Sequence, residues 1–510
     1  MELKVTKDLT TAGEVVFDSF SELPIECDLM LPDYCPDMVK ILKCAVTPVF
    51  TRSEVNGDKL ICEGNCMVAL YYADDQSAIR LSEHKVAFSK TIELKTTPEA
   101  PTVFASAGVD YVNCRAVSGR RADVRGAFTI TARVLGQHSE EVVSGAEGDG
   151  IQLRKKEVDT DRILGSASRR FTVREELELG PARVPAEYVI RHSEAARMTD
   201  CKLIAGKIIT KGELRIRILY MPREGGRPET ADYTLPVSQI VDLDGVDEEC
   251  GCDAFYSVKA AEISPRTDLD GESRAFSAEV TLETEACVTK PGRTAAVTDA
   301  YSTSCEASYS VRPITLLRRL EELHLQGLRE ETMELPEEAE EVLDLWCEPA
   351  RFSSQTENGE WVLSGKCLIC LFARDKEGAP LYFERPLELT ASRPIPPECA
   401  NVFAGVRVTV PETEYSLTGT RQLSIRAACL TEGALYGAFP CGMMGELKTD
   451  RSKERKAPAA ALTIYYAEAG ENIWEIAKHF GTSVLEVMEE NGLEQEALGE
   501  RKMLLIPQVG

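Results

Sequence analysis

The sequence predicts a mainly β protein, made of three repeated, sandwich-like β modules followed by a small α+β domain at its C-terminal end. Three observations support this prediction. Three kinds of sequence landmark recur three times in the same order and with nearly constant spacing. Between the landmarks, apolar and polar residues alternate with a period of two, as in strands that bury one face. Residues 462–508 follow a different order: strand, helix, helix, strand.

The landmarks define the repeat. The first is an apolar residue followed by proline, at Leu31–Pro32, Val184–Pro185 and Leu335–Pro336. The second is a glycine within an apolar strand pattern, at Gly64, Gly212 and Gly365. The third is a later glycine, at Gly119, Gly271 and Gly419, which follows the second by 55, 59 and 54 residues in turn. Such regularity indicates a triplicated unit, and we predict modules at 20–146, 169–293 and 305–447.

The strand pattern is clearest beside the second and third landmarks. Each second landmark opens a strand, a polar turn and another strand, which is typical of a β-hairpin. In 213–218 every second residue is apolar, and 276–283 repeats this alternation. One wet and one buried face per strand favours a sandwich of two sheets.

Two segments of the third module carry a helical pattern instead. Leucines at 316, 317, 320, 323 and 325 form an apolar stripe, which predicts a helix over 314–325. The run 330–344 contains eight acidic residues and no basic ones, and Pro336 followed by glutamates resembles the start of a helix. This run is either a solvated helix face or a docking surface for a basic partner.

Residues 448–461 read as a linker between the third module and the C-terminal domain. The segment is basic at first and then rich in alanine and proline, which predicts a flexible tether. Its positive charge on a strongly negative chain leaves contact with an acidic patch as the alternative.

The C-terminal domain, residues 462–508, contains two short amphipathic helices between two strands. Apolar residues fall at one-face helical spacing in two stretches: Ile473, Ile476, Ala477 and Phe480, then Val484, Val487 and Met488. Gly481 ends the first helix, and Asn491–Gly492 ends the second as a left-handed cap. Strands at 462–466 and 503–506 flank the helices.

This domain resembles a LysM domain. The matching residues are Tyr466, Ala469–Glu471, Ile473–Ala477, Phe480–Gly481, Asn491 and Leu504–Pro507. The resemblance implies a groove for N-acetylglucosamine polymers between the loop before the first helix and the loop after the second. Its candidate binding residues here are Gly470, Glu471, Asn472, Ile473, Trp474, Asn491, Gly492 and Leu493. The usual Asp-Thr after the loop glycine is replaced by Glu471–Asn472, which makes glycan binding weak at best.

Trp474 has two interpretations. It lies about 100° around the helix from Ile473, on the edge of the apolar stripe. It is either an exposed anchor for a binding partner or a side chain that packs on a neighbouring loop.

The whole arrangement resembles the SipL-like spore-coat morphogenetic proteins, whose repeats are called SPOCS domains. The first module carries the best match, LMLPDYCPDMVKIL, with Leu31, Pro32, Asp33, Pro36, Asp37, Ile41 and Leu42. The second module keeps Val184–Pro185 and lacks the second Pro-Asp. The resemblance implies a mother-cell cytoplasmic protein at the forespore surface. It would act in sporulation as a scaffold that binds the coat-basement ATPase SpoIVA, partly through LysM, together with other coat proteins.

Composition narrows the functional classes. A formal net charge of −26 argues against nucleic-acid partners, which select for basic surfaces. No apolar run is long enough for a membrane span. The five histidines are scattered, and Cys367 and Cys370 sit three apart in a strand pattern, so they point to opposite faces.

We therefore expect no catalytic residues, no cofactor and no metal, and a chain that is not an enzyme. The rival interpretation is a peptidoglycan-binding protein of the cell wall or cortex, held by its LysM domain through N-acetylglucosamine polymers.

Overall fold

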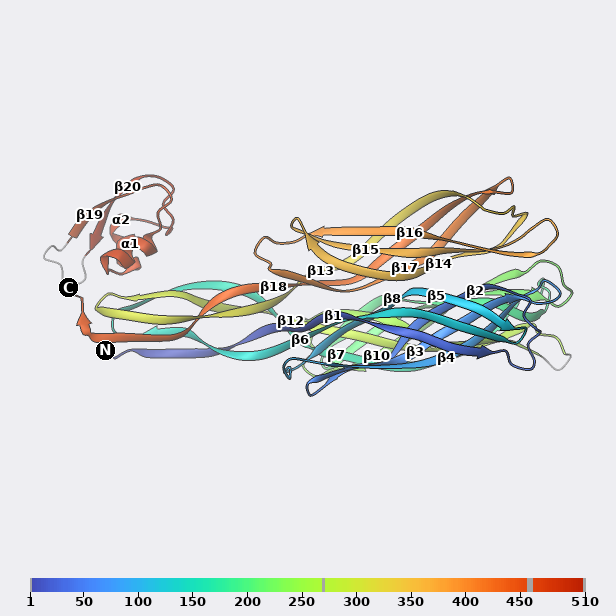
Figure 1. The fold of residues 1–510 in the computed structure, drawn as a ribbon. Coiled ribbons are helices and arrows are strands. Elements are labelled where there is room, and N and C mark those ends of the chain that lie inside the picture. Colours follow the sequence, from blue (N-terminus) through green and yellow to red (C-terminus); the bar gives the residue numbers. More distant parts are fainter. Residues whose placement is uncertain (1, 268–270, 456–461, 508–510) are drawn as a thin grey trace.

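The computed structural model describes residues 2–267, 271–455 and 462–507, and it confirms a mainly β fold with a small α+β domain at its C-terminal end. Figure 1 shows an elongated molecule, with the bulk of the β modules at one end and the small domain at the other. Within the described residues, neither helix has the length or the apolar content that crossing a membrane requires.

Each module contains six strands in the same order. The first module has β1 (Lys4–Met30), β2 (Lys40–Asn56), β3 (Lys59–Ala73), β4 (Ile79–Glu93), β5 (Thr102–Ser118) and β6 (Arg121–Glu147). The second has β7 (Ile151–Glu178), β8 (Ala186–Ile204), β9 (Lys207–Pro222), β10 (Glu229–Asp242), β11 (Gly251–Arg266) and β12 (Ala275–Ser302). The third has β13 (Cys305–Glu334), β14 (Glu341–Glu357), β15 (Glu360–Arg374), β16 (Pro380–Pro394), β17 (Asn401–Thr418) and β18 (Gln422–Glu454).

The six strands of a module pair into two antiparallel three-stranded sheets. The orders are β1-β6-β5 and β2-β3-β4 in the first module, with the same pattern in β7–β12 and in β13–β18. The two sheets face one another across a buried apolar core in each module. The strand alternation seen in the sequence is the alternation between this core and the outside.

The second landmark glycine has a steric cause. Gly64, Gly212 and Gly365 lie in the central strand of the smaller sheet, where the neighbouring strand bulges. A Cβ at these positions would collide with a backbone oxygen of that neighbour, Val49 or Arg197 in the first two modules. Glycine is therefore required at this close approach in all three repeats.

The first and last strands of each module continue beyond the sandwich as a two-stranded ribbon. The pairs β1/β6, β7/β12 and β13/β18 run side by side to the far end of the molecule (Figure 1). Each ribbon carries bulges at corresponding places, one near the exit from the sandwich and one nearer the tip, and the third ribbon has a further one at its very end. Bulges increase local twist, which lets the three ribbons wrap around a shared axis.

Equivalent residues of the three ribbons form the core of this bundle. Val142, Ala296 and Met443 belong to one buried cluster. Their immediate neighbours Val143, Val297 and Met444 belong to the next cluster along the axis. Because adjacent residues of a strand point to opposite faces, each ribbon is buried on both sides at this level.

This two-sided burial explains why the helix predicted over 314–325 is wrong. The segment lies within strand β13. Leu316 and Leu317 are consecutive and are both buried, one in the bundle core and the other at the junction with the sandwiches. A bulge between Arg319 and Glu321 then shifts the alternation by one residue. Double burial and a register shift together imitate a helical stripe.

The helix suggested for 330–344 is also wrong. Residues up to Glu334 belong to β13, and β14 begins at Glu341, with a turn at Pro336 between them. Several of the acidic side chains face basic ones across the sheet, as Glu330 does with Arg426. The acidic residues of the run that lie in strands are thus placed for cross-strand charge pairing, and not for a helix dipole.

The first half of the basic segment 448–461 forms a β-strand, although a flexible tether was predicted for the whole segment. Residues 448–454 continue β18, and 456–461 lie outside the described residues. Arg451 pairs with Asp149 at 2.8 Å, and Lys453 pairs with Glu306 at 2.8 Å. The positive charge of this segment thus meets acidic residues at the ribbon tips, as the alternative interpretation of the linker proposed.

The smaller sheets of the three modules meet through an apolar cluster that includes Tyr71, Leu219 and Phe372. The residues paired opposite these three are Lys43, Arg191 and Asp344, each placed directly after a bulge. Structurally equivalent positions therefore carry two cations and one anion. Arg191 contacts Asp344 at 2.6 Å with both side chains buried, and Lys43 reaches Glu348 at 3.1 Å.

We predict that Arg191→Met lowers the free energy of unfolding by about 3–5 kcal/mol, because it leaves the Asp344 carboxylate buried without its partner. Urea denaturation measures the effect. The double variant Arg191→Met/Asp344→Leu should recover much of the loss. Arg174→Met, which breaks an exposed pair with Glu279, is the control and should change little. Equal stability of the Arg191 and Arg174 variants would contradict the role of the buried pair.

A second prediction concerns pH. His192 contacts Glu194 at 2.8 Å and Glu83 of the first module at 3.2 Å. Burial alone would lower the pKa of His192, but the two carboxylates outweigh burial and raise it to about 10. Because the pKa is higher in the folded than in the unfolded chain, protonated His192 stabilises the fold. This stabilisation is complete below the unfolded pKa of about 6.5 and is lost as the pH rises towards 10.

The stability difference between the unmodified chain and His192→Gln should therefore be largest at pH 6 and should shrink steadily up to pH 10. Urea denaturation across this range, repeated for both proteins, measures it. Subtracting the free energy of unfolding of the variant from that of the unmodified chain removes the contributions of the other titrating groups. A difference that is independent of pH would rule out the charged histidine.

Candidate binding site

The tail domain, residues 462–507, forms strand β19 (Leu462–Ala467), helix α1 (Ile473–Phe480), helix α2 (Val484–Asn491) and strand β20 (Lys502–Pro507). The predicted order of strand, helix, helix, strand is confirmed. Strands β19 and β20 pair antiparallel, and the helices pack on one face of them around Ile473, Ala477, Val487 and Leu504.

Polar groups of the loop before α1 form hydrogen bonds within the tail domain itself. Gly470 adopts a φ of 92°, and its N–H donates to the Leu498 carbonyl at 2.8 Å. Glu471 accepts hydrogen bonds from the Tyr465 hydroxyl at 2.9 Å and the Glu468 N–H at 2.8 Å. The Asn472 side chain caps α1 by accepting from the Trp474 N–H at 2.8 Å. Helix capping thus accounts for the asparagine at this position.

The loop after α2 has a similar structural role. The Asn491 amide donates to the carbonyls of Val487 and Leu505 and accepts from the Leu505 N–H at 2.7 Å. Gly492 is the left-handed cap with φ of 58°, and Leu493 packs on the tail core. This clamp ties the end of α2 to β20, so these residues build the domain.

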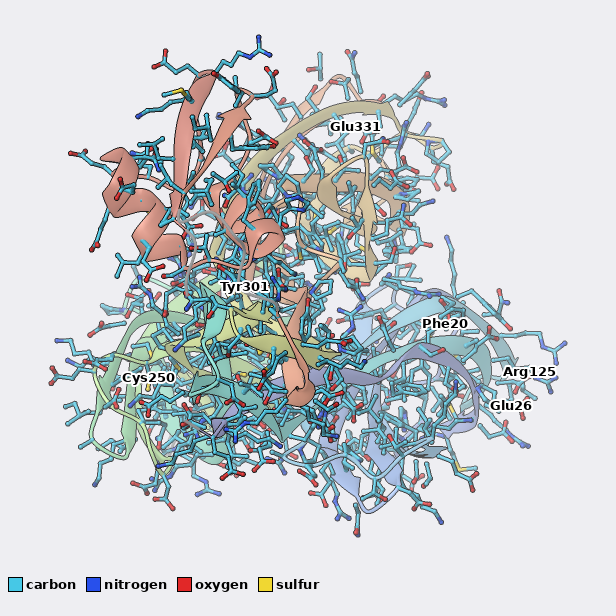
Figure 2. All side chains as sticks on the ribbon, turned by 90° about the vertical axis from the view of Figure 1, so that its left-hand side faces the viewer. Phe20, Glu26, Arg125, Cys250, Tyr301 and Glu331 are labelled. Carbon is cyan, nitrogen blue, oxygen red and sulfur yellow. The ribbon has the colours of Figure 1, made fainter. Side chains whose placement is uncertain are left out.

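Trp474 is only 3% exposed, so its prediction as an exposed anchor is wrong. The second interpretation, that the Trp474 side chain packs on a neighbouring part of the protein, is confirmed. The part that it packs on is strand β12 of the second ribbon and not a loop. Its ring meets Tyr301 edge to face with centroids 5.0 Å apart. Its indole N–H donates to Asp299 Oδ2 at 2.8 Å. The end-on view in Figure 2 shows Tyr301 between the tail domain and the ribbons.

Asp299 is the polar centre of this contact. Lys478 Nζ lies 2.7 Å from both carboxylate oxygens, and the Tyr309 hydroxyl donates at 2.7 Å. Burial would raise the pKa of Asp299, but the hydrogen bonds from Lys478, Tyr309 and Trp474 outweigh burial and lower it. A charged carboxylate with three donors therefore holds α1 on the ribbon tip.

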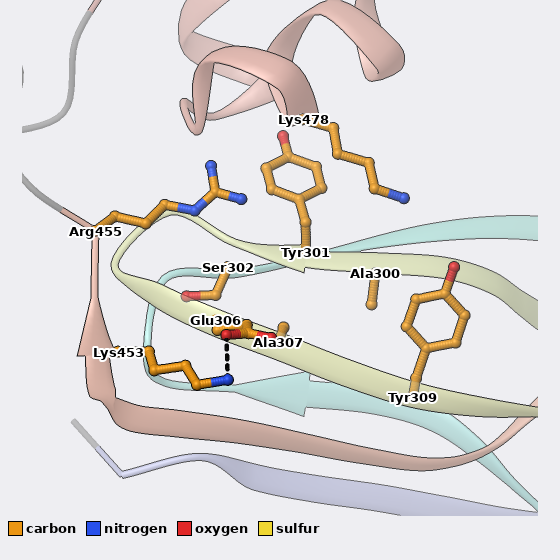
Figure 3. A pocket seen from close by; sticks show the side chains of 9 residues that line it. All are labelled: Ala300, Tyr301, Ser302, Glu306, Ala307, Tyr309, Lys453, Arg455 and Lys478. Carbon is orange, nitrogen blue, oxygen red and sulfur yellow. Dashed lines mark ion pairs between the residues drawn. The ribbon is translucent and has the colours of Figure 1, made fainter.

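Beside this contact lies an open pocket of about 460 Å³. Figure 3 shows its lining, with Tyr301 pointing towards the tail helices and Lys453 paired with Glu306 on the ribbon side. Its lining residues are Ala300, Tyr301, Ser302, Glu306, Ala307, Tyr309, Lys453, Arg455 and Lys478. None of the eight residues predicted for a glycan groove lines it.

Sequence reasoning missed Asp299 and Tyr301, which lie in the second module, 175 and 173 residues before Trp474. They occupy an ordinary strand pattern, so only the three-dimensional arrangement identifies them. Within the described residues, no group of three or more His, Cys, Asp or Glu side chains is arranged to hold a metal ion.

The outer face of the β19–β20 sheet is the opposite surface of the tail and is strongly apolar. Its cross-strand pairs are Leu462 with Pro507, Ile464 with Leu505 and Tyr466 with Met503. Ile464 is 57% exposed, Tyr466 67% and Met503 50%. Aromatic and aliphatic side chains facing solvent in adjacent pairs are typical of a binding surface.

Comparison with protein families identifies the repeats. The family model described as SipL, SPOCS domain matches residues 22–117 and 185–265. The chain is a SipL-like protein with SPOCS repeats. Comparisons with curated proteins and with solved structures gave no match. The SPOCS repeats associate the chain with sporulation and the spore coat.

The two matches cover corresponding parts of the fold. The first runs from the end of β1 to β5, and the second runs from the start of β8 to β11. The third module has the same strand order and sheet pairing as these two SPOCS repeats. The assignment of the tail as a LysM domain stays a prediction from its sequence.

We predict that Asp299→Ala in the second SPOCS module loosens the tail from the ribbon. The variant removes the acceptor for Trp474 and Lys478 without changing any tail residue. Amide hydrogen exchange should become faster in 473–480, which is the measurement. Glu475→Gln, which breaks only a partly exposed pair with Arg154, is the control and should leave exchange unchanged. Unaltered exchange in the Asp299 variant would contradict docking through this carboxylate.

Proposed function

We propose that this SipL-like chain is a non-enzymatic scaffold of spore-coat assembly that binds the coat-basement ATPase SpoIVA through its tail domain. In this proposal the protein acts in the mother-cell cytoplasm at the forespore surface, and it recruits further coat proteins through its SPOCS modules. The observation that carries the proposal is the exposed apolar face of the β19–β20 sheet, together with the spore-coat association of the SPOCS repeats.

The sheet face suits a protein partner. Ile464, Tyr466, Met503 and Leu505 present a flat surface without a charged group among them. Burial of such a surface against another protein is favourable at about 25 cal/mol per Å² of apolar area. A tyrosine at its centre adds a hydroxyl that can find a polar partner at the rim.

The groove suits a sugar polymer poorly, which favours a protein over a glycan. The backbone N–H groups of Gly470 and Ile473 already donate to Leu498 and Glu496. The amides of Asn472 and Asn491 are bound to the helices and to β20. A glycan would have to displace these bonds to gain its own. Peptidoglycan binding at the wall or cortex therefore remains the second candidate, supported only by the LysM resemblance.

The ribbon bundle supports a scaffold. It joins the three SPOCS modules into one body through shared apolar clusters, and the tail lies beside the ribbon tips, at the end away from the sandwiches (Figure 1). A partner held by the tail would thus leave the distant module surfaces free for other proteins.

We predict that Tyr466→Thr/Met503→Gln weakens binding to the SpoIVA-type ATPase by at least about tenfold, the effect of losing about 1.4 kcal/mol of apolar contact. Biolayer interferometry with the full chain measures the affinity. Deleting residues 462–510 should weaken binding to the ATPase at least as much as this double variant does. Leu485→Gln, which changes a 64% exposed side chain of α2, is the matched control and should bind normally.

Unchanged affinity of the sheet-face variant would refute this docking face. A titration of the same proteins with N-acetylglucosamine hexamer tests the second candidate. Tight hexamer binding combined with no binding of the ATPase would overturn the proposed function in favour of the glycan.

A further inference from the structure

Two pairs of cysteines face one another across the seam where the two sheets of a module meet. In the first module this seam lies between β2 and β5, and in the second between β8 and β11. The strands of a seam belong to different sheets, so no ladder of backbone hydrogen bonds joins them in the described sheets. Side chains alone connect the sheets along this edge.

The strand register places the first pair inside the sandwich. Cys114 of β5 lies opposite Val124, and Cys44 of β2 lies opposite Leu70. Val124 and Leu70 are fully buried core residues. Cross-strand partners point to the same face, so both thiols point into the core from the two sides of the seam.

Both side chains pack against the core of the first module, and strands β2 and β5 are in contact along the seam. The interaction with Cys44 lowers the pKa of the Cys114 thiol against the opposing effect of burial. Cys114 is only partly buried, so the seam is open to solvent at this residue. A stabilised thiolate with an accessible sulfur is the reactive form of cysteine.

The second module repeats the arrangement with different residues. Cys201 of β8 lies opposite Thr210, and Cys252 of β11 lies opposite Val288. Thr210 and Val288 are fully buried. Both side chains pack against one apolar cluster, and the interaction with Cys252 lowers the pKa of the Cys201 thiol. Cys201, like Cys114, is only partly buried.

We propose that Cys44–Cys114 and Cys201–Cys252 are oxidisable pairs that close into disulfides across the seams of the first two modules. The oxidant is a low-molecular-weight disulfide, such as oxidised glutathione. Each bond would fasten the two sheets of one module covalently at the edge that lacks a backbone ladder.

The reaction proceeds by two exchanges. The Cys114 thiolate attacks one sulfur of glutathione disulfide, forms a mixed disulfide and releases one glutathione thiolate. The Cys44 thiol then loses its proton, attacks the Cys114 sulfur and releases the second glutathione. Two protein thiols are oxidised to one disulfide, and one glutathione disulfide is reduced to two thiols. In the second module Cys201 attacks and Cys252 completes the bond.

The third module provides internal controls. Its seam lies between β14 and β17, and β17 contains no cysteine, so Cys347 of β14 has no thiol across the seam. Its thiol neighbours, Cys367 and Cys429, lie inside the module core. Cys367 and Cys370 lie in strand β15, as predicted, with Cys367 in the module core and Cys370 in the cluster between modules. Their side chains point to opposite faces, so they cannot join to each other.

The test is oxidation of the folded full-length chain with glutathione disulfide, followed by alkylation and peptide mass spectrometry. Four of the 17 cysteines should lose reactivity, and linked peptides 44–114 and 201–252 should appear. The midpoint of thermal unfolding should rise and return on reduction, because each bond constrains a long loop of the unfolded chain. Cys347, Cys367 and Cys370 should remain free thiols.

Two single variants separate the pairs. Cys114→Ala should keep only the 201–252 link, and Cys201→Ala only the 44–114 link, so each variant reports on its own folding through the remaining bond. A glutathione adduct on Cys114 that Cys44 never displaces would overturn the first pair, and the same result at Cys201 the second. Crosslinks that involve the three control cysteines equally would overturn the proposal as a whole.

Discussion

The packing of three β-ribbons against one another is the constraint on which the architecture depends. Each sandwich has its own core, but the modules become one body only where Val142, Ala296 and Met443, and then Val143, Val297 and Met444, converge. An isolated two-stranded ribbon is only marginally stable in water. Three ribbons that bury both faces together form a core of their own, and this core requires all three repeats at once.

The charged residues at the module interface help to determine which of the three similar modules lies beside which. If the three modules were identical at the interface, nothing would fix which one lies beside which. Lys43, Arg191 and Asp344 occupy the same structural position in the three modules; Arg191 pairs with Asp344, whereas Lys43 pairs with Glu348. A buried ion pair contributes little net stability, but it discriminates strongly against arrangements that leave a charge unpaired.

The sequence was sufficient to predict the triplication, the strands and the order of elements in the tail, because those features are local or periodic. It failed where burial came from another module. Leu316 and Leu317 look helical only because a neighbouring ribbon covers the second face of their strand. Trp474 could not be assigned from its helix alone, since Tyr301 and Asp299 approach it from a distant part of the chain. The glycan groove was predicted from a motif whose polar residues serve as caps and clamps here.

The ribbons also set a length. A strand of 27 residues, such as β1, spans roughly 90 Å when extended at about 3.3 Å per residue. Because the three ribbons pack against one another, the bundle forms a spacer between the tail domain and the broad end of the molecule. Two molecules bound at opposite ends of this bundle would be held apart by a distance that the number of residues per strand sets.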